Sequence, residues 1–233
     1  MTTKVKAYPN LSLDINDMVV YTEANSKLMP ITALFVDIGG VLLTDGWNHD
    51  ARALAAKTFD LDWTEMETRH RLNFATYEEG KITLEKYLER TVFYTERSFS
   101  VDKFTEFMFA QSEPYPLMID LIRHLKKKYG LKIIVVSNEA RELNLHRIQK
   151  FKLNEFIDGF ISSCFVHIRK PDEDIFKLAL DISQCASNQI IYIENTPMFV
   201  QIAEGLGMKS ILHQEYQSTA LQLAVWGLNH QEH

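Results

Sequence analysis

The stretch Ala33-Leu-Phe-Val-Asp-Ile-Gly-Gly-Val-Leu-Leu43 decides the fold prediction for this chain. Four apolar residues lead into Asp37, and the pair Gly39-Gly40 follows. A charged carboxylate is costly to bury among apolar groups, so we expect Asp37 at the open carboxyl end of a parallel strand, facing a cation or a substrate. The glycines allow a tight turn and a close approach of a ligand to the backbone. A strand that simply ends in an Asp-capped turn is the alternative.

Further apolar runs along the chain also end in polar residues. Residues 131–136 precede Ser137, and residues 190–193 precede Glu194. Residues 209–212 are expected to form one more short strand. Strands that alternate with segments of helical period predict a doubly wound parallel α/β sheet. In such a sheet the carboxyl ends of the strands meet at one crevice. The side chains expected to converge there are Asp37, Ser137, Lys170, Glu194 and Asn195.

The interval between Asp37 and Ser137 is far longer than a single crossover requires, and its pattern is helical. Thr64-Glu-Met-Glu67 matches a capping box, and apolar residues recur at helical spacing from Leu84 to Val92. We therefore predict a helical cap over residues 46–113, inserted into an α/β core of residues 31–45 and 114–233. Residues 1–30 are predicted to form an N-terminal arm.

Charge and cysteine content narrow the function classes. The formal net charge of −6 leaves no basic face for nucleic acid. No apolar run approaches the roughly 20 residues that cross a bilayer. Cys164 and Cys185 form neither a metal-type pair nor a disulfide framework, which is typical of a reducing compartment. The sequence predicts a cytoplasmic protein with no nucleic-acid or membrane partner.

Four motifs, in this order, resemble those of the haloacid dehalogenase superfamily of phosphatases and related hydrolases. They are Asp37-x-Gly-Gly, Ser137-Asn138, Lys170-Pro-Asp and Glu194-Asn195, each at the end of a predicted strand or the start of a predicted helix. The resemblance covers residues 34 to about 212. It implies a Rossmann-like core with a helical cap between the first and second motifs.

The resemblance further implies a magnesium-dependent phosphatase that acts on a small phosphorylated metabolite. Asp37 would attack phosphorus and form an aspartyl phosphate, while Ser137 and Lys170 would stabilise charge on the transferring phosphoryl group. The expected substrate contacts are Gly39, Gly40 and Asn138. The expected magnesium ligands are Asp37, the backbone oxygen of Gly39, Glu194 and Asn195.

Two residues depart from the usual pattern of this superfamily. Gly39 stands where a second aspartate usually protonates the leaving group and activates water, work that contributes roughly 10²- to 10⁴-fold. Asn195 stands where a second acid is usual, so magnesium should bind weakly. Turnover is then slow, or it needs a good leaving group, or another residue replaces the missing acid. The candidate replacements are Asp45, His49 and Glu139.

Two other functions remain open. One is a degenerate family member that binds a phosphorylated ligand or a partner without turnover, and the other is a dehalogenase, which uses the same nucleophile without a metal. Substrate choice would depend on the cap. The cap residues that could face the site, each of which could equally be an ordinary packing or helix-surface residue, are Trp47, His49, Arg69, His70, Arg71 and Tyr77.

Overall fold

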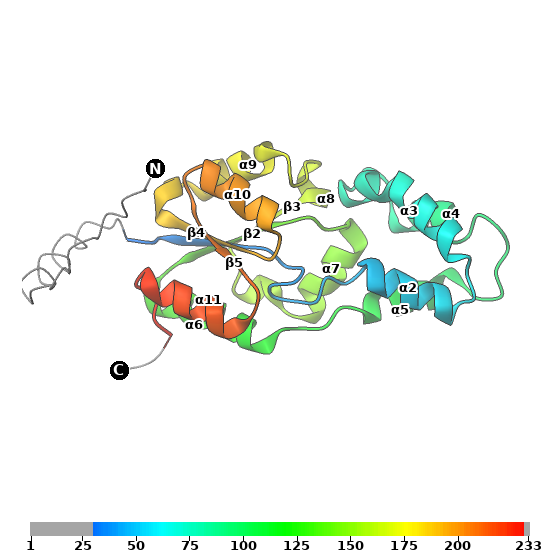
Figure 1. The fold of residues 1–233 in the computed structure, drawn as a ribbon, viewed down its shortest axis with the longest axis horizontal. Coiled ribbons are helices and arrows are strands. Elements are labelled where there is room, and N and C mark those ends of the chain that lie inside the picture. Colours follow the sequence, from blue (N-terminus) through cyan, green and yellow to red (C-terminus); the bar gives the residue numbers. More distant parts are fainter. Residues whose placement is uncertain (1–29, 231–233) are drawn as a thin grey trace, which may run out of the picture. The chain divides into compact units, whose positions relative to one another are not determined.

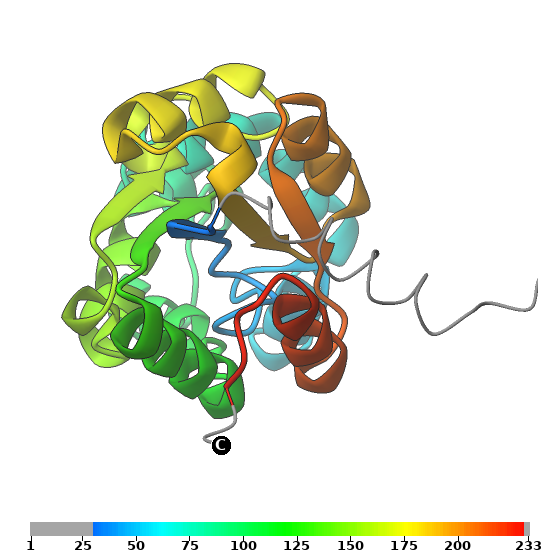
Figure 2. The same cartoon turned by 90° about the vertical axis from the view of Figure 1, so that its left-hand side faces the viewer.

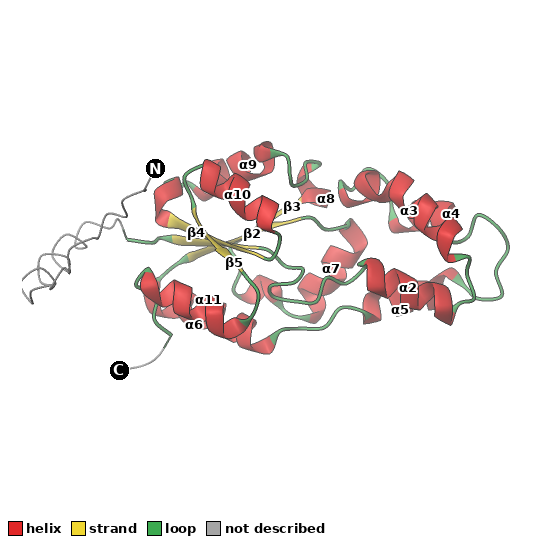
Figure 3. Cartoon of the chain, viewed as in Figure 1, coloured by secondary structure: helices red, strands yellow, loops and turns green. Residues whose placement is uncertain are grey.

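The computed structural model describes residues 30–230 and centres on a five-stranded parallel sheet (Figures 1 and 3). The strands are β1 (Ala33–Val36), β2 (Lys132–Ser137), β3 (Gly159–Ser162), β4 (Ile190–Glu194) and β5 (Lys209–Leu212). They lie in the order β3-β2-β1-β4-β5, with every neighbouring pair parallel. This confirms the predicted α/β fold. The predicted arm, residues 1–30, lies outside the described residues except for Pro30.

Helices cover both faces of the sheet, as Figure 2 shows. On one face lie α6 (Pro116–Tyr129), α7 (Arg141–Lys150) and α11 (Tyr216–Val225), and on the other lie α9 (Glu173–Ser183) and α10 (Pro197–Gly205). Side chains alternate along β1, so Leu34 and Val36 pack into the first layer while Ala33 and Phe35 pack into the second. All four are fully buried, which explains why this strand is apolar without interruption.

Four helices follow β1 before the chain returns to the sheet at α6. They are α2 (His49–Thr58), α3 (Trp63–Glu78), α4 (Leu84–Thr91) and α5 (Val101–Ala110), here called the cap helices. They share an apolar cluster of their own that includes Tyr87, Leu88 and Phe104. Each begins at a side chain that accepts a hydrogen bond from its first turn: Asn48, Asp62, Thr83 and Ser100.

The predicted capping box of α3 begins two residues too late. The N-cap is Asp62, which accepts from the Glu65 amide, and Thr64 lies inside the helix. Asp62 and Thr64 both have a short side chain that can accept a hydrogen bond, and each is followed three residues later by a glutamate, so the local sequence does not choose between them.

The remaining short elements are η2 (Leu153–Glu155), α8 (Ser163–Val166) and η3 (Ser187–Gln189). Among the described residues, no helix combines the length and apolar character needed to cross a membrane.

Two chain segments connect the cap helices to the sheet, and they are hydrogen-bonded to each other. The Thr44 amide donates to the Glu113 carbonyl oxygen at 2.9 Å, and the Thr44 hydroxyl donates to the Gln111 carbonyl oxygen at 2.8 Å. The Tyr115 amide donates to the Leu42 carbonyl oxygen at 2.9 Å. The chain therefore leaves and re-enters the core as a paired ribbon.

Candidate active site

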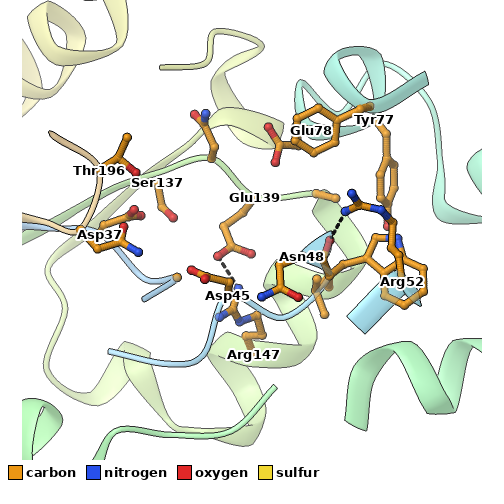
Figure 4. Close-up of a pocket in the computed structure, with 17 residues that line it drawn as sticks. Asp37, Asp45, Asn48, Arg52, Tyr77, Glu78, Ser137, Glu139, Arg147 and Thr196 are labelled. Atoms are coloured by element: carbon orange, nitrogen blue, oxygen red, sulfur yellow. Dashed lines mark hydrogen bonds and ion pairs between the residues drawn. The ribbon is translucent and has the colours of Figure 1, made fainter. Parts of the chain in front are cut away.

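A cavity of about 320 Å³ opens at the carboxyl ends of β1, β2 and β4, beneath the cap helices (Figure 4). The sheet contributes Asp37, Ser137 and, just after β4, Asn195 to its lining. The cap side contributes Trp47, Asn48, Arg52, Phe74, Tyr77 and Glu78. Residues distant in sequence thus meet at the strand ends, where ligands bind in open α/β sheets.

Asp37 lines this cavity, and the buried Lys170 lies directly beside Asp37 but outside the cavity lining. Lys170 Nζ lies 3.1 Å from Asp37 Oδ2, and the other carboxylate oxygen of Asp37 accepts the Ile38 amide at 2.8 Å. The lysine is 1% exposed. Burial alone would lower the pKa of Lys170, but the carboxylates of Asp37 and Glu194 outweigh it and hold that pKa above its usual value. The site therefore contains a permanent cation beside the expected nucleophile.

Glu194 holds this lysine rather than facing the cavity. Its Oε2 accepts hydrogen bonds from Lys170 Nζ at 2.6 Å and from the Tyr192 hydroxyl at 2.5 Å. Its Oε1 accepts the Thr196 amide at 2.9 Å, and the residue is fully buried. The sequence predicts Glu194 as a magnesium ligand. In the structure both its oxygens accept hydrogen bonds from protein donors and one of them anchors Lys170, while its role toward magnesium stays a prediction.

Of the four predicted magnesium ligands, the three that line the cavity are Asp37, Gly39 and Asn195. A Cβ on Gly40, whose φ is +70°, would overlap the Asn195 side chain, so glycine is what lets this amide lie against the turn after Asp37. Within residues 30–230, no three His, Cys, Asp or Glu side chains group as a metal site. One carboxylate with neutral oxygens still suits Mg²⁺, which takes one or two carboxylates and completes its shell with water and phosphate.

Two of the predicted substrate contacts have other partners. Asn138 Nδ2 donates to the Lys170 carbonyl oxygen at 2.9 Å, and its Oδ1 accepts the Lys170 amide at 2.8 Å. Although Asn138 lines the cavity, its amide thus positions Lys170. The Gly40 amide donates to the Leu43 carbonyl oxygen at 2.8 Å, and Gly40 is not part of the cavity lining. Gly39 and Ser137 do line it.

The cap residues singled out from sequence divide into two groups. Trp47 and Tyr77 line the cavity. The other four do not line it. One of them, His70, is buried with its Nδ1 2.7 Å from the Tyr87 hydroxyl, and three have other partners. Those three are His49 beside Asp50, Arg69 paired with Glu65 and placed over the Tyr94 ring, and Arg71 near the Thr68 hydroxyl.

Three buried or partly buried ion pairs in the cavity wall were not identified from the sequence. Arg52 donates two hydrogen bonds to Glu67, at 2.9 and 2.8 Å, and Arg147 donates to Glu139 at 2.6 Å. The third pair joins Glu78 to Arg169 at 2.7 Å. Arginine and glutamate have the same sequence appearance whether their side chains face water or a cavity, so no local signal identifies these pairs.

Glu78 is the carboxyl of these pairs that faces the site from the cap side. Burial is the main cause that raises its pKa to about 7; Arg169 opposes this rise, and the Glu139 charge adds to it. Its backbone carbonyl oxygen also accepts the Ser163 hydroxyl at 2.7 Å. The end of α3 is therefore held to the core by both side chain and backbone.

Comparison with known proteins places this chain in a family. The sequence model of the family described as haloacid dehalogenase-like hydrolase matches residues 31–207. Bifunctional epoxide hydrolase 2 of Rattus norvegicus is 27% identical over 130 residues, which are 54% of this chain and 23% of that protein. The chain therefore spans about a quarter of the length of this relative. Flavin mononucleotide hydrolase 1 of Arabidopsis thaliana is 23% identical over 205 residues, or 88% of this chain and 81% of that protein.

Solved structures agree at the level of the fold. A haloacid dehalogenase family enzyme from Bacteroides thetaiotaomicron superposes with a TM-score of 0.69 at 18% identity, over 80% of this chain and 95% of that one. The same enzyme in complex with magnesium and inorganic phosphate gives 0.67 at 18% identity, over 79% and 94%. A predicted hydrolase of this type from Porphyromonas gingivalis gives 0.69 at 20% identity, over 84% and 98%. This chain belongs to the family of haloacid dehalogenase-like hydrolases.

Proposed function

We propose that this protein is a magnesium-dependent phosphatase that hydrolyses a small phosphate monoester through an aspartyl phosphate at Asp37. The observation that carries the proposal is the Asp37 carboxylate at the cavity floor, 8% exposed, with Lys170 Nζ 3.1 Å away. A nucleophilic carboxylate beside a fixed cation suits phosphoryl transfer, in which charge accumulates on the transferring oxygens. The solved relative that holds magnesium and inorganic phosphate supports the same chemistry.

In this mechanism Asp37 attacks phosphorus, and the ester oxygen leaves. Lys170, held in place by Glu194 and by Asn138, stays protonated and stabilises the transferring oxygens, with the Ser137 hydroxyl as a further donor. Magnesium, when bound by Asp37, the Gly39 backbone oxygen and Asn195, would neutralise phosphate charge and orient the phosphoryl group. Water then releases phosphate from Asp37.

The cavity limits the substrate to a small molecule. Its volume of about 320 Å³ is at the lower end of small-ligand sites. Trp47, Phe74 and Tyr77 form an apolar wall opposite the strand ends, suited to the organic part of the ester. The arginines of the wall are already paired with glutamates, which disfavours a substrate with several phosphate groups.

The competing function is ligand binding without turnover. Its support is the absence of a carboxylate at Gly39 and of a second acid at Asn195. Covalent phosphorylation of Asp37 separates the two functions, because a binding protein forms no such bond.

The test is hydrolysis of an aryl phosphate with and without magnesium, followed by mass spectrometry of acid-quenched enzyme. We expect magnesium-dependent turnover and a phosphate adduct at Asp37. Asp37→Asn, which is nearly isosteric, should lose both while remaining folded. Asp181→Asn, at an exposed position on α9, serves as the control for loss of a carboxylate. A tenth of the wild-type rate in Asp37→Asn would exclude Asp37 as the nucleophile.

A further inference from the structure

The chain lacks an acid at Gly39, yet its cavity contains an unpaired carboxylate directly beside that position. We infer that Asp45 is the general acid and general base of this site, donating a proton to the leaving group and later taking one from water. This inference rests on the proposed phosphatase function. It names the residue that takes the role of the acid absent at position 39.

The geometry of the turn after Asp37 is the first support. A Cβ built on Gly39 would lie 3.4 Å from Asp45 Oδ1, and one built on Gly40 would lie 3.0 Å from the same oxygen. The Asp45 carboxylate thus occupies the space toward which a side chain from position 39 would extend. Asp45 also lines the cavity together with Asp37 (Figure 4). A carboxylate is present where the chemistry requires one, although it comes from a different part of the chain.

The partners of the other acids are the second support. Glu139 accepts a hydrogen bond from Arg147 at 2.6 Å, and Glu78 accepts from Arg169 at 3.0 Å. His49 lies outside the cavity lining. Asp45, within residues 30–230, has no hydrogen bond or ion pair from its carboxylate. Its carboxylate is therefore available to contact a substrate or a water molecule.

The backbone around Asp45 is fixed although its side chain is exposed. The preceding residue, Thr44, donates its amide to Glu113 and its carbonyl oxygen accepts a hydrogen bond from the buried Arg147. The following residue, Gly46, has φ of +66°, and a Cβ there would lie 3.5 Å from the Arg147 guanidinium. Arg147 is thus hydrogen-bonded to the residue before Asp45 and lies close to the residue after it, while no ion pair joins it to the Asp45 carboxylate.

The proposed proton transfers balance over the two half-reactions. As Asp37 attacks phosphorus and the bond from phosphorus to the ester oxygen breaks, protonated Asp45 gives its proton to that oxygen, and the alcohol leaves. Asp45, now a carboxylate, takes a proton from a water molecule whose oxygen attacks the phosphorus of the aspartyl phosphate. The bond between phosphorus and Asp37 breaks, inorganic phosphate leaves, and both carboxyl groups return to their starting forms.

The experiment compares Asp45→Asn with the wild type on an alkyl phosphate and on an activated aryl phosphate. A poor leaving group needs the proton, so kcat/KM for the alkyl phosphate should fall roughly a hundredfold or more. For the aryl phosphate, phosphorylation of Asp37 should persist while its hydrolysis slows, giving a burst of phenol and an accumulated phosphoenzyme. Asp50→Asn removes the same charge five positions later, at an exposed site outside the cavity, and should behave as the wild type.

Two results would overturn the inference. One is wild-type kinetics of Asp45→Asn on both substrates. The other is an equal loss of kcat/KM on both substrates without a burst, which would show that Asp45 has only a structural role. Failure of the proposed function is distinguishable from these, because the wild type itself would then neither turn over the aryl phosphate nor form the adduct at Asp37, and both proposals would fall together.

Discussion

Lys170 lies between two carboxylates in the interior, so its removal affects both stability and chemistry. Lys170→Met should cost about 3–5 kcal/mol of unfolding free energy, because it leaves Glu194 charged and buried without a counterion. It should also lower kcat/KM sharply, since the transferring phosphoryl group loses a fixed cation. Urea denaturation and steady-state kinetics measure the two losses.

The double variant Lys170→Met with Glu194→Gln separates these effects. Removing the Glu194 charge should restore much of the stability, whereas activity should stay low because the cation beside Asp37 is still missing. Activity that returned with stability would show that Lys170 serves the fold alone. A wild-type denaturation midpoint in Lys170→Met would contradict the buried ion pair itself.

Asn195 offers a test of the magnesium site. Asn195→Asp adds a carboxylate at the position where the amide lies against Gly40, so magnesium affinity should rise roughly tenfold or more, equivalent to about 1.4 kcal/mol. Isothermal titration calorimetry measures it without any substrate. Asn188→Asp adds the same charge at an exposed position and should leave the affinity unchanged. No gain in Asn195→Asp would exclude Asn195 as a ligand.

The positions of site residues were easier to predict than their partners. Asp37 and Ser137 end apolar strands, and parallel strand ends meet by topology, so their convergence follows from the sequence. The hydrogen bonds of Asn138 and Glu194 depend on which backbone and side-chain donors surround them after folding. Nothing local to Glu194 indicates that Lys170 and Tyr192 will occupy its oxygens. The sequence therefore predicts where these residues lie, whereas their hydrogen-bond partners depend on the folded surroundings.

At the scale of elements, the turn between α3 and α4 packs against the α8 region of the core. Gly80 has φ of +65°, and a Cβ there would overlap the Cys164 carbonyl oxygen. The Glu79 carbonyl oxygen is 2.6 Å from His167 Nδ1. This contact ties the cap helices to the core at a point distant from the paired ribbon at Thr44 and Glu113. The cap helices are thereby attached to the core in two places.

Gly80→Ala tests that contact, and Gly130→Ala is its matched control. Gly130 has nearly the same backbone conformation, with φ of +67°, but nothing lies within 4 Å of its Cβ position. Gly130→Ala should therefore cost only the left-handed strain, about 1–2 kcal/mol. Gly80→Ala should cost roughly a further 1–3 kcal/mol from displaced backbone. Chemical denaturation of both variants measures the difference. Equal losses of unfolding free energy would show that the Gly80 turn does not pack against Cys164.

For the whole molecule, Glu78 makes stability depend on pH. Its pKa in the folded state is about 7, against an ordinary value of 4.5, so between these values the folded protein binds more protons than the unfolded chain. Its stabilising contribution is therefore complete below about pH 4.5 and is lost as pH rises toward 7, a change of about 3 kcal/mol at most.

Glu78→Gln should remove this dependence. The difference in unfolding free energy between variant and wild type should grow in favour of the variant from pH 4.5 to 7 and then stay level, as followed by urea denaturation at a series of pH values. Arg169→Gln should extend the decline to higher pH, because Arg169 opposes the raised pKa. A pH-independent difference for Glu78→Gln would contradict the assignment.

The central place of β1 has a consequence for how the chain reaches its fold. Ala33 pairs with Lys132 on one side and with Ile190 on the other, so neither partner strand exists until long after β1 has been synthesised. Closing such long loops is slow. A nascent chain that ends after α7 presents the apolar edge of residues 33–36 without its β4 neighbour. That edge can pair with other unfinished chains until Ile190–Glu194 emerges from the ribosome.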